Sequence, residues 1–238
     1  MTRSCCHWER REAISCRLAL VSVRRQGGGM GEVAEQEKRV AELRHSRGEE
    51  HPETLTAMLD LAELLWKEGR LRPARMLEEQ VVAARLRRFG EKHPDTLKAM
   101  GKLATTIGMQ GDLATARALQ ARIVELAPEV WGEDGRDRWR ALNNLAGTVA
   151  TEGDLFAARE LLQTAIVAMT GIWGEEDGDT LAAMGNLASV LWQMGAPDEA
   201  YWLQQQVVDT RQRIFGDDDP ATRAAVAAFA AMQREAGV

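Results

Sequence analysis

The chain has only three cysteines, and all of them lie near the start: Cys5, Cys6 and Cys16. The rest of its 238 residues therefore cannot form a disulfide bond, which suits a reducing cytosol, and a cytoplasmic protein is expected. No stretch approaches the roughly 18 to 20 uninterrupted apolar residues of a membrane span, so no membrane partner is expected. Aromatic residues make up only 5% of the chain, with a single tyrosine. This scarcity argues against an all-β fold.

The chain also lacks an overall excess of basic residues, since its formal net charge is −6. Non-specific nucleic-acid binding requires a basic face, so no nucleic-acid partner is expected. Residues 1–29 differ from the rest, because six arginines and two glutamates give them a local charge of +4. This segment ends in the Gly-rich stretch 27–31. We predict that residues 1–29 are disordered or a mis-called extension of the gene, with Met30 as an alternative start.

Glycines mark a repeat of 42 residues. A first set starts each copy and a second set follows 21 residues later: Gly48, Gly90, Gly132, Gly174, Gly216, and then Gly69, Gly111, Gly153, Gly195, Gly237. Between the two sets, apolar residues recur at helical spacing, as at 55, 58, 61, 62 and 65 of the first copy. Each copy is therefore predicted to be a helix, a turn at the second glycine and another helix.

Prolines and aspartates predict where these helices begin. The first helix of a copy should start near Pro52, Pro94 or Pro220, because a proline in the first turn costs no backbone hydrogen bond. Asp112 and Asp154 follow mid-repeat glycines and should cap the second helix. A proline at 128 lies inside a predicted second helix and should kink it or end it early.

The repeat resembles the tetratricopeptide repeat, in the 42-residue version found in kinesin light chains. Segments 48–55 (GEEHPETL) and 90–97 (GEKHPDTL) resemble that version's G-x-x-H-P-x-T-L signature, whereas the third and fourth copies lack the His-Pro pair. The resemblance implies an all-α fold, a right-handed superhelical solenoid of helix-turn-helix repeats, whose concave surface binds proteins or peptides.

The same alignment sets the predicted organisation of the chain. After the extension of residues 1–29, residues 30–238 form a single solenoid. Its parts are a lead helix, four repeats and a terminal segment: 32–47, 48–89, 90–131, 132–173, 174–215 and 216–238.

In this family the first helix of each repeat lines the concave face, so the resemblance places a peptide-binding groove on these helices. The predicted groove residues are Asp60, Glu63, Trp66, Lys67, Lys98, Lys102, Arg140, Asn143, Asn144, Asn186, Ser189, Trp192 and Gln193. Asn144 and Asn186 stand where the family's groove asparagines hydrogen-bond a peptide backbone.

The predicted groove has a local charge of +2, from four basic and two acidic side chains, and should attract acidic residues of a ligand. Trp66 and Trp192 would supply apolar anchorage. Four glycines inside the first helices are expected to leave room for the ligand: Gly101, Gly108, Gly147 and Gly185. A merely solvated face is the alternative, because positions that face only water would vary between copies just as much.

Other candidate sites are weaker. His51 and His93 could bind a metal, but each precedes a helix-starting proline, and a role in starting the helix is favoured. The cysteines, with His7, have no recognised zinc spacing. No nucleophile, base and orienting group recur together. We therefore expect neither an enzyme nor a cofactor or metal.

The last predicted helix, 220–236, is rich in alanine on its outer face, while Val226, Phe229 and Met232 are expected to pack inward. This outer face suggests contact with a partner or a second copy of the chain. The sequence thus predicts a non-catalytic scaffold for a protein or peptide segment with acidic and apolar residues. The alternatives are a peptide-sensing regulatory module and a structural homo-oligomer that associates through the C-terminal helix.

Overall fold

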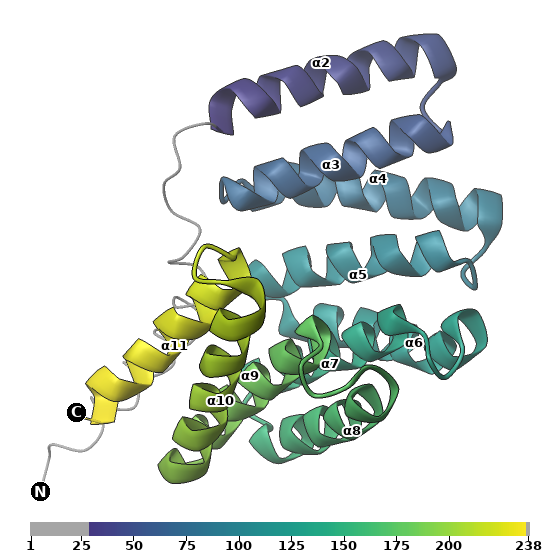
Figure 1. Ribbon diagram of the computed structural model, residues 1–238. Helices are drawn as coiled ribbons and strands as arrows, with labels where there is room; N and C mark the ends of the chain where they lie inside the picture. The colour runs from purple at the N-terminus through teal and green to yellow at the C-terminus, as the bar shows by residue number, and fades with distance from the viewer. Residues whose placement is uncertain (1–28, 237–238) are drawn as a thin grey trace, which may run out of the picture. The chain divides into compact units, whose positions relative to one another are not determined.

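The computed structural model describes the backbone of residues 29–236 and the side chains of residues 31–236. The predictions for residues 1–28, including the cysteines and the first two residues of the Gly-rich stretch, lie outside the described residues. Within them the chain forms ten α-helices and no strand (Figure 1). The helices are α2 (Gly29–Arg47), α3 (Pro52–Lys67), α4 (Leu71–Phe89), α5 (Pro94–Met109), α6 (Leu113–Trp131), α7 (Arg136–Thr151), α8 (Leu155–Trp173), α9 (Gly178–Gln193), α10 (Pro197–Phe215) and α11 (Pro220–Ala236).

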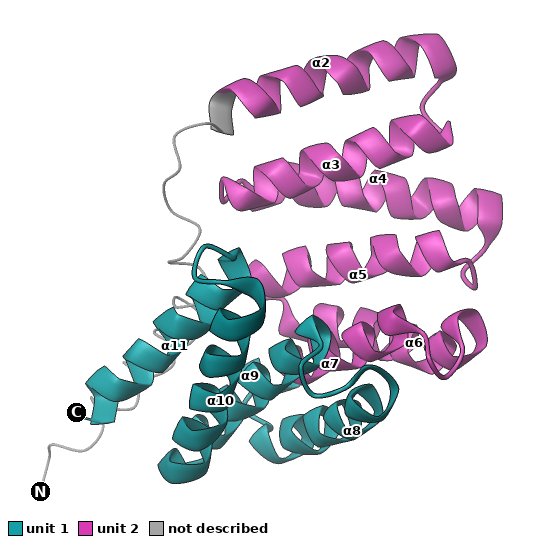
Figure 2. Cartoon of the chain, viewed as in Figure 1, with its two compact units in different colours: residues 1–24, 149–238 teal, residues 25–148 magenta. Residues whose placement is uncertain are grey.

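The described residues divide into two compact units, shown in different colours in Figure 2. The N-terminal unit contains α2 to α6 and α7 as far as Thr148, and the C-terminal unit contains the end of α7 from Val149 and α8 to α11. In each complete repeat a helix of 16 residues is followed by one of 19 residues, as with α3 and α4. The predicted helix pair per copy is therefore confirmed.

Glycines with positive φ separate the helices. Gly111, between α5 and α6, has φ of 94°, and Gly90, between α4 and α5, has φ of 79°. A side chain with a Cβ atom is strained in this left-handed region, whereas glycine is not. The other repeat glycines between residues 48 and 216 also have positive φ, so the glycine period of the sequence marks the turns of the fold.

The predicted helix starts are also confirmed. The Nδ1 atoms of His51 and His93 accept hydrogen bonds from the backbone N–H groups two residues later, at 3.3 and 3.2 Å. Each histidine is thus the N-cap of a helix whose first residue is proline. Asp112 and Asp154 cap α6 and α8 through Oδ1, which accepts from the N–H three residues on. Where the His-Pro pair is missing before α9, Asp177 serves as the cap.

The expectation for Pro128 that its helix ends early is wrong. Helix α6 continues through Pro128 to Trp131 and has the same 19 residues as α4, α8 and α10. Pro128 lies in the last turn, where it removes one backbone bond to the preceding turn. Its own carbonyl still accepts from the N–H of Gly132 at 3.1 Å, so the helix closes normally.

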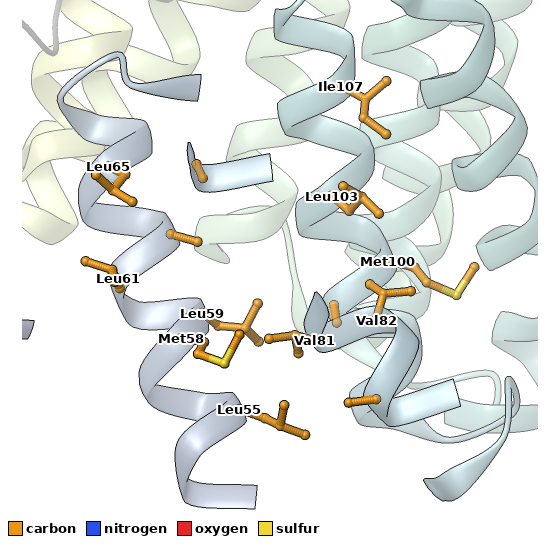
Figure 3. Packing of buried hydrophobic residues seen from close by; sticks show 14 of the residues in the cluster. Leu55, Met58, Leu59, Leu61, Leu65, Val81, Val82, Met100, Leu103 and Ile107 are labelled. Carbon is orange, nitrogen blue, oxygen red and sulfur yellow. The ribbon is translucent and has the colours of Figure 1, made fainter. Parts of the chain in front are cut away.

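The core of the N-terminal unit is built from the recurring apolar positions. In Figure 3, Leu55, Met58 and Leu59 of α3 lie close to Val81 of α4. Leu55 and Leu97, which occupy the same place in successive repeats, are 2% and 1% exposed. The small residues at the other recurring positions are fully buried, including Ala62 and Ala74 at 0%. These alanines let the two helices of a repeat approach closely.

In three of the repeats an ion pair connects two parts of the same repeat. One partner lies in the loop before the first helix, and the other lies near the end of the second helix. Glu50 lies 2.6 Å from Arg87, and Lys92 lies 2.8 Å from Glu129. The second pair has the same positions as the first with the charges exchanged. In the C-terminal unit Glu176 pairs with Arg213, in the same sense as the first pair.

The C-terminal unit ends in α11, which packs on α10. Phe229 and Met232 are buried against that neighbour, as predicted, but Val226 is 38% exposed. No helix follows α11 among the described residues, so one side of it is left uncovered, and this is the side on which Val226 lies.

Helix α8 is long and apolar enough to cross a membrane by length and composition alone. Its Arg159 and Glu160 interrupt the apolar run. Within the C-terminal unit α8 packs on α9 as the second helix of its repeat, and its apolar composition belongs in part to that packing.

Candidate functional site

The predicted groove residues all lie in the first helices of the repeats. Those of the N-terminal unit lie on α3 (Asp60, Glu63, Trp66, Lys67), on α5 (Lys98, Lys102) and on α7 (Arg140, Asn143, Asn144). Those of the C-terminal unit lie on α9 (Asn186, Ser189, Trp192, Gln193). The two groups are described separately below, each within its own unit.

One carboxylate holds two lysines on the surface of α3 and α5. Oε1 of Glu63 lies 3.0 Å from Nζ of Lys67, one turn along α3, and its Oε2 lies 2.8 Å from Nζ of Lys102 on α5. Hydrogen bonds from Lys102 and then from Lys67 lower the pKa of Glu63 to about 2. We call these three residues the Glu63 triad; it links the first helices of two successive repeats.

A second triad links α5 to α7. Nζ of Lys98 lies 2.9 Å from Oδ2 of Asp137, and Nη1 of Arg140 lies 3.7 Å from Oδ1 of the same carboxylate. We call these residues the Asp137 triad. Asp137 was missed by the sequence reasoning, because it lies in the first turn of α7, ahead of the positions counted as inward-facing. Its spacing of three residues from Arg140, which brings two side chains to one helix face, could have indicated it.

The charge of this surface therefore needs correction from +2 to +1, since Asp137 adds one negative charge to the predicted set. Each triad carries two cations around one anion. The cations are accessible all the same: the side chains of Lys67, Lys98, Lys102 and Arg140 are 44% to 55% exposed. A ligand carboxylate can thus approach them without displacing Glu63 or Asp137.

Three of the four helix glycines face a neighbouring helix and not a ligand space. A Cβ atom on Gly108 would lie 3.4 Å from Cβ of Ala116, and one on Gly101 would lie 3.9 Å from Cδ1 of Ile123. Both contacts are on α6, so these glycines permit close packing of α5 on the second helix of its own repeat. Gly185 likewise faces Gln204 of α10, at 3.7 Å. A Cβ atom added to Gly147 would meet no described atom within 4 Å, so there is open space beside this glycine.

The predicted amide groups differ in accessibility. Asn144 on α7 and Asn186 on α9 are exposed, whereas Asn143 is half-buried. Exposed amides can donate to and accept from a peptide backbone at the same time. Asn144 is therefore accessible on the helix that also carries Asp137 and Arg140.

Both predicted groove tryptophans make contacts within the protein. Trp66 is half-buried and packs against the core of the N-terminal unit. Trp192 is half-buried, and its indole N–H donates to Oε2 of Glu235 on α11 at 2.8 Å. Glu235 was not anticipated from the sequence. Each tryptophan is thus only partly accessible.

The remaining residues on α9 bond within their own helix. The Ser189 hydroxyl donates to the Gly185 carbonyl at 3.1 Å, and the Gln193 amide donates to the Ser189 carbonyl at 3.3 Å. No group of three or more His, Cys, Asp or Glu side chains that could hold a metal ion occurs within residues 31–236. The predicted surface of α9 is polar but carries no charged residue, in contrast to that of α3, α5 and α7.

Comparisons with known proteins agree with this architecture. Residues 54–95 and 180–221 match the family model of the tetratricopeptide repeat. No curated protein sequence matches the chain. Among solved structures, BtubC (BKLC) of P. vanneervenii has a TM-score of 0.68 and 19% identity over 89% of this chain and 85% of that one.

A second solved structure is a kinesin light chain-type protein of Podospora anserina with nearly identical TPR-like repeats. It has a TM-score of 0.63 and 23% identity over 86% of this chain and 95% of that one. A form of the same protein with one substitution has a TM-score of 0.65. These similarities confirm the all-α repeat solenoid as the fold.

Proposed function

We propose, from the premise that this chain is a tetratricopeptide repeat protein of the kinesin light chain-like type, that it is a non-catalytic scaffold for protein or peptide partners. Stacked helix pairs of this kind generally serve as protein-interaction surfaces. The finer proposal is that the first helices bind a peptide segment with acidic and apolar residues, in the cytoplasm.

The pair of triads on α3, α5 and α7 is the observation that carries this proposal. Four half-exposed cations lie on three successive first helices, held in place by Glu63 and Asp137. Cations that are already oriented lose less side-chain entropy when a ligand carboxylate arrives. The exposed amide of Asn144 adds a backbone partner beside them, and Trp66 adds apolar surface.

Peptide selection against the intact chain tests the proposal. Peptides selected from a random 12-residue library are expected to be enriched in Asp and Glu. They should lose at least about tenfold in affinity for a variant with Lys98→Gln, Lys102→Gln and Arg140→Gln, since hydrogen bonds to charged groups contribute about 1.5–3 kcal/mol. Glutamine is preferred to glutamate here, because charge reversal would place new carboxylates beside Glu63 and Asp137 and weaken the fold as well.

Two matched variants separate binding from folding. Glu63→Gln removes the anion between Lys67 and Lys102 and should strengthen the binding of the same peptides, although it removes two ion pairs from the fold. Arg87→Gln removes a cation that pairs with Glu50 at the leading loop and should leave binding unchanged. If the selected peptides have no acidic bias, or bind the triple variant as well as the original chain, the groove assignment fails.

A second candidate is self-association through α11. The specific observation is its uncovered side, where Val226 is 38% exposed and its neighbours Ala224 and Ala227 are exposed as well. Sedimentation equilibrium of the intact chain would detect a dimer, and Val226→Asp should dissociate it. A monomer at the highest accessible concentration would exclude this candidate and leave the peptide proposal untouched.

A further inference from the structure

Two glutamines make the same bond between neighbouring repeats. The side-chain amide of Gln36 on α2 donates to the main-chain carbonyl of Ala57 on α3, at 3.0 Å. The side-chain amide of Gln204 on α10 donates to the carbonyl of Ala225 on α11, at 2.9 Å. In both cases donor and acceptor are 21 residues apart, and the bond ties a second helix to the first helix of the next repeat.

The first repeat has a glutamate at this position. Glu78 lies 42 residues after Gln36, on α4, and the carbonyl 21 residues further on belongs to Ala99 of α5. Glu78 is 3% exposed and Ala99 is 0% exposed, so both lie in the interface between the two helices. A carboxylate has no proton to donate to a carbonyl, unlike the amide that stands in its place elsewhere.

Glu78 is only partly satisfied as a carboxylate, since one of its two oxygens lacks a partner. Its Oε2 atom is buried and has no hydrogen-bond partner among the described residues, and the same is true of the nearby Thr106 hydroxyl on α5. A buried, unpartnered carboxylate oxygen is costly, whereas a protonated acid has no net charge and gains a donor.

The surroundings of Glu78 act on its pKa in opposite directions. Burial comes first and raises its pKa, and Glu79 on the same helix acts in the same direction. The Thr106 hydroxyl and Lys102, both on α5, act in the opposite direction. Lys102 is also paired with Glu63 of α3, which pairs with Lys67 as well. The negative charge of Glu63 therefore offsets part of the effect of Lys102 on the pKa of Glu78. The net effect is a raised pKa.

We propose that Glu78 is a proton-dependent latch between α4 and α5. When protonated, its carboxyl O–H donates to the Ala99 carbonyl, as the amides of Gln36 and Gln204 do to theirs. When Glu78 is ionised, this bond is absent and a negative charge is left in the interface, which loosens the contact between the two repeats. The latch thus holds the repeats together at low pH and releases them as the pH rises.

The sign of the pH dependence follows from proton linkage. Between the unfolded pKa of 4.5 and the raised folded pKa, the folded protein binds more protons than the unfolded chain. The stabilisation from Glu78 is therefore complete below the unfolded value and is lost as the pH rises through the folded value. Each pKa unit between the two corresponds to about a tenfold change in the unfolding equilibrium constant.

Urea unfolding of the intact chain and of Glu78→Gln, from about pH 5 to about pH 9, tests the proposal. Glutamine reproduces the amide of Gln36 and Gln204 and cannot titrate. We expect the unfolding equilibrium constant of the original chain to rise relative to that of the variant as the pH rises over this range. A ratio that does not change with pH would overturn the proposal.

A local readout distinguishes the latch from a general change in stability. Hydrogen exchange of the α5 amides in the original chain, compared with Glu78→Gln at each pH, should show faster relative exchange as the pH rises. Exchange in α9 should stay equal in the two proteins. Equal exchange of α5 in both proteins at all pH values would overturn the proposal.

A second variant, Glu78→Leu, shows whether a result obtained with Glu78→Gln comes from the loss of the titrating group or from a disturbance of the fold by glutamine itself. Leucine occupies the equivalent position in the third repeat, where Leu162 is fully buried, so Glu78→Leu should also fold. The proposal requires Glu78→Leu to lack the pH dependence, as Glu78→Gln does. It also requires Gln204→Glu to create a new one, with faster exchange of α11 as the pH rises. If Gln204→Glu shows no such change, a carboxyl group at this position is not a latch.

Discussion

Small side chains set the distance between the two helices of each repeat. Ala62 and Ala104 in first helices, and Ala74 and Ala116 in second helices, are all 0% exposed. Protein interiors are packed too densely for such positions to accept a larger group without movement of a neighbour. The identity of one residue therefore controls the geometry of two helices.

Ala104→Leu is expected to destabilise the protein by about 1–3 kcal/mol, because it overpacks the contact between the helices of the second repeat. Ala121→Leu is the control, since Ala121 is exposed on α6 and leucine has nearly the same helix propensity. Thermal unfolding of both variants measures the effect. An unchanged melting temperature for Ala104→Leu would contradict the close approach.

The acid stability of the chain should depend on Glu63. Its pKa of about 2 is below the unfolded value of 4.5, so its ion pairs stabilise the fold above pH 4.5, and this stabilisation is lost as the pH falls toward 2. Because the triad is largely exposed, its contribution is at most about 1 kcal/mol. The stability difference between the original chain and Glu63→Gln should shrink between those pH values, as followed by urea unfolding. Exposed Glu35 offers the control Glu35→Gln, for which no such change is expected.

Residue identities predicted the caps and the buried positions but not the ion pairs of the candidate site. Lys102 pairs with Glu63 and Lys98 with Asp137, each across 39 residues of sequence. Such pairs join different helices and depend on the rotamers of long side chains, which no pattern in the sequence specifies. For this reason the charge of the predicted groove was overestimated.

At the level of elements, the helix boundaries depend on a few backbone rules. Proline at the first position and a capping side chain before it started α3 and α5 as predicted. The rule that proline ends a helix did not hold at Pro128, because packing of the other residues of α6 compensates for one lost bond in the last turn. Helix interiors are decided by packing more than by local preference.

Pro128→Ala should therefore stabilise the protein, by about 1–2 kcal/mol, since alanine restores a backbone N–H in α6 and has a far higher helix propensity. Pro197→Ala is the matched control, because Pro197 begins α10 and its N–H would have no partner in the helix. Chemical denaturation of both variants makes the comparison. Equal stability changes at the two prolines would mean that the position within the helix is irrelevant.

Across the whole molecule, the 42-residue period carried the fold prediction, because a repeated pattern fixes the helix pair, the turn and the stacking surface at once. The period does not specify what happens at its ends. Helix α2 keeps the register of a second helix, but Glu32 and Arg39 are exposed where the next repeat has the fully buried Ala74 and Val81. Such a polar side suits the outer surface of the first helix that the structure describes.

Hydrogen exchange should consequently be graded along the N-terminal unit. Among the described residues α2 packs mainly on α3, with a hydrogen bond from Arg44 to Gln80 of α4, whereas α5 packs on both α4 and α6. The amides of α2 are expected to exchange at least about tenfold faster than those of α5, since opening an end helix breaks one interface and not two. Mass spectrometry of peptides from each helix provides the measurement. Uniform protection from α2 to α6 would show that the unit opens only as a whole.

The exchanged charges of Lys92 and Glu129 have a consequence for recombination between copies. Each pair joins two ends of the same repeat, so duplication or exchange of a complete 42-residue unit carries both partners together. A crossover at the mid-repeat turn would instead combine the leading loop of the first repeat with the second helix of the second, and would place Glu50 opposite Glu129. Two like charges would then face each other where two opposite charges now meet. The genetic unit that can be shuffled without loss is thus the whole repeat, although the helix pattern alone would allow the exchange of single helices.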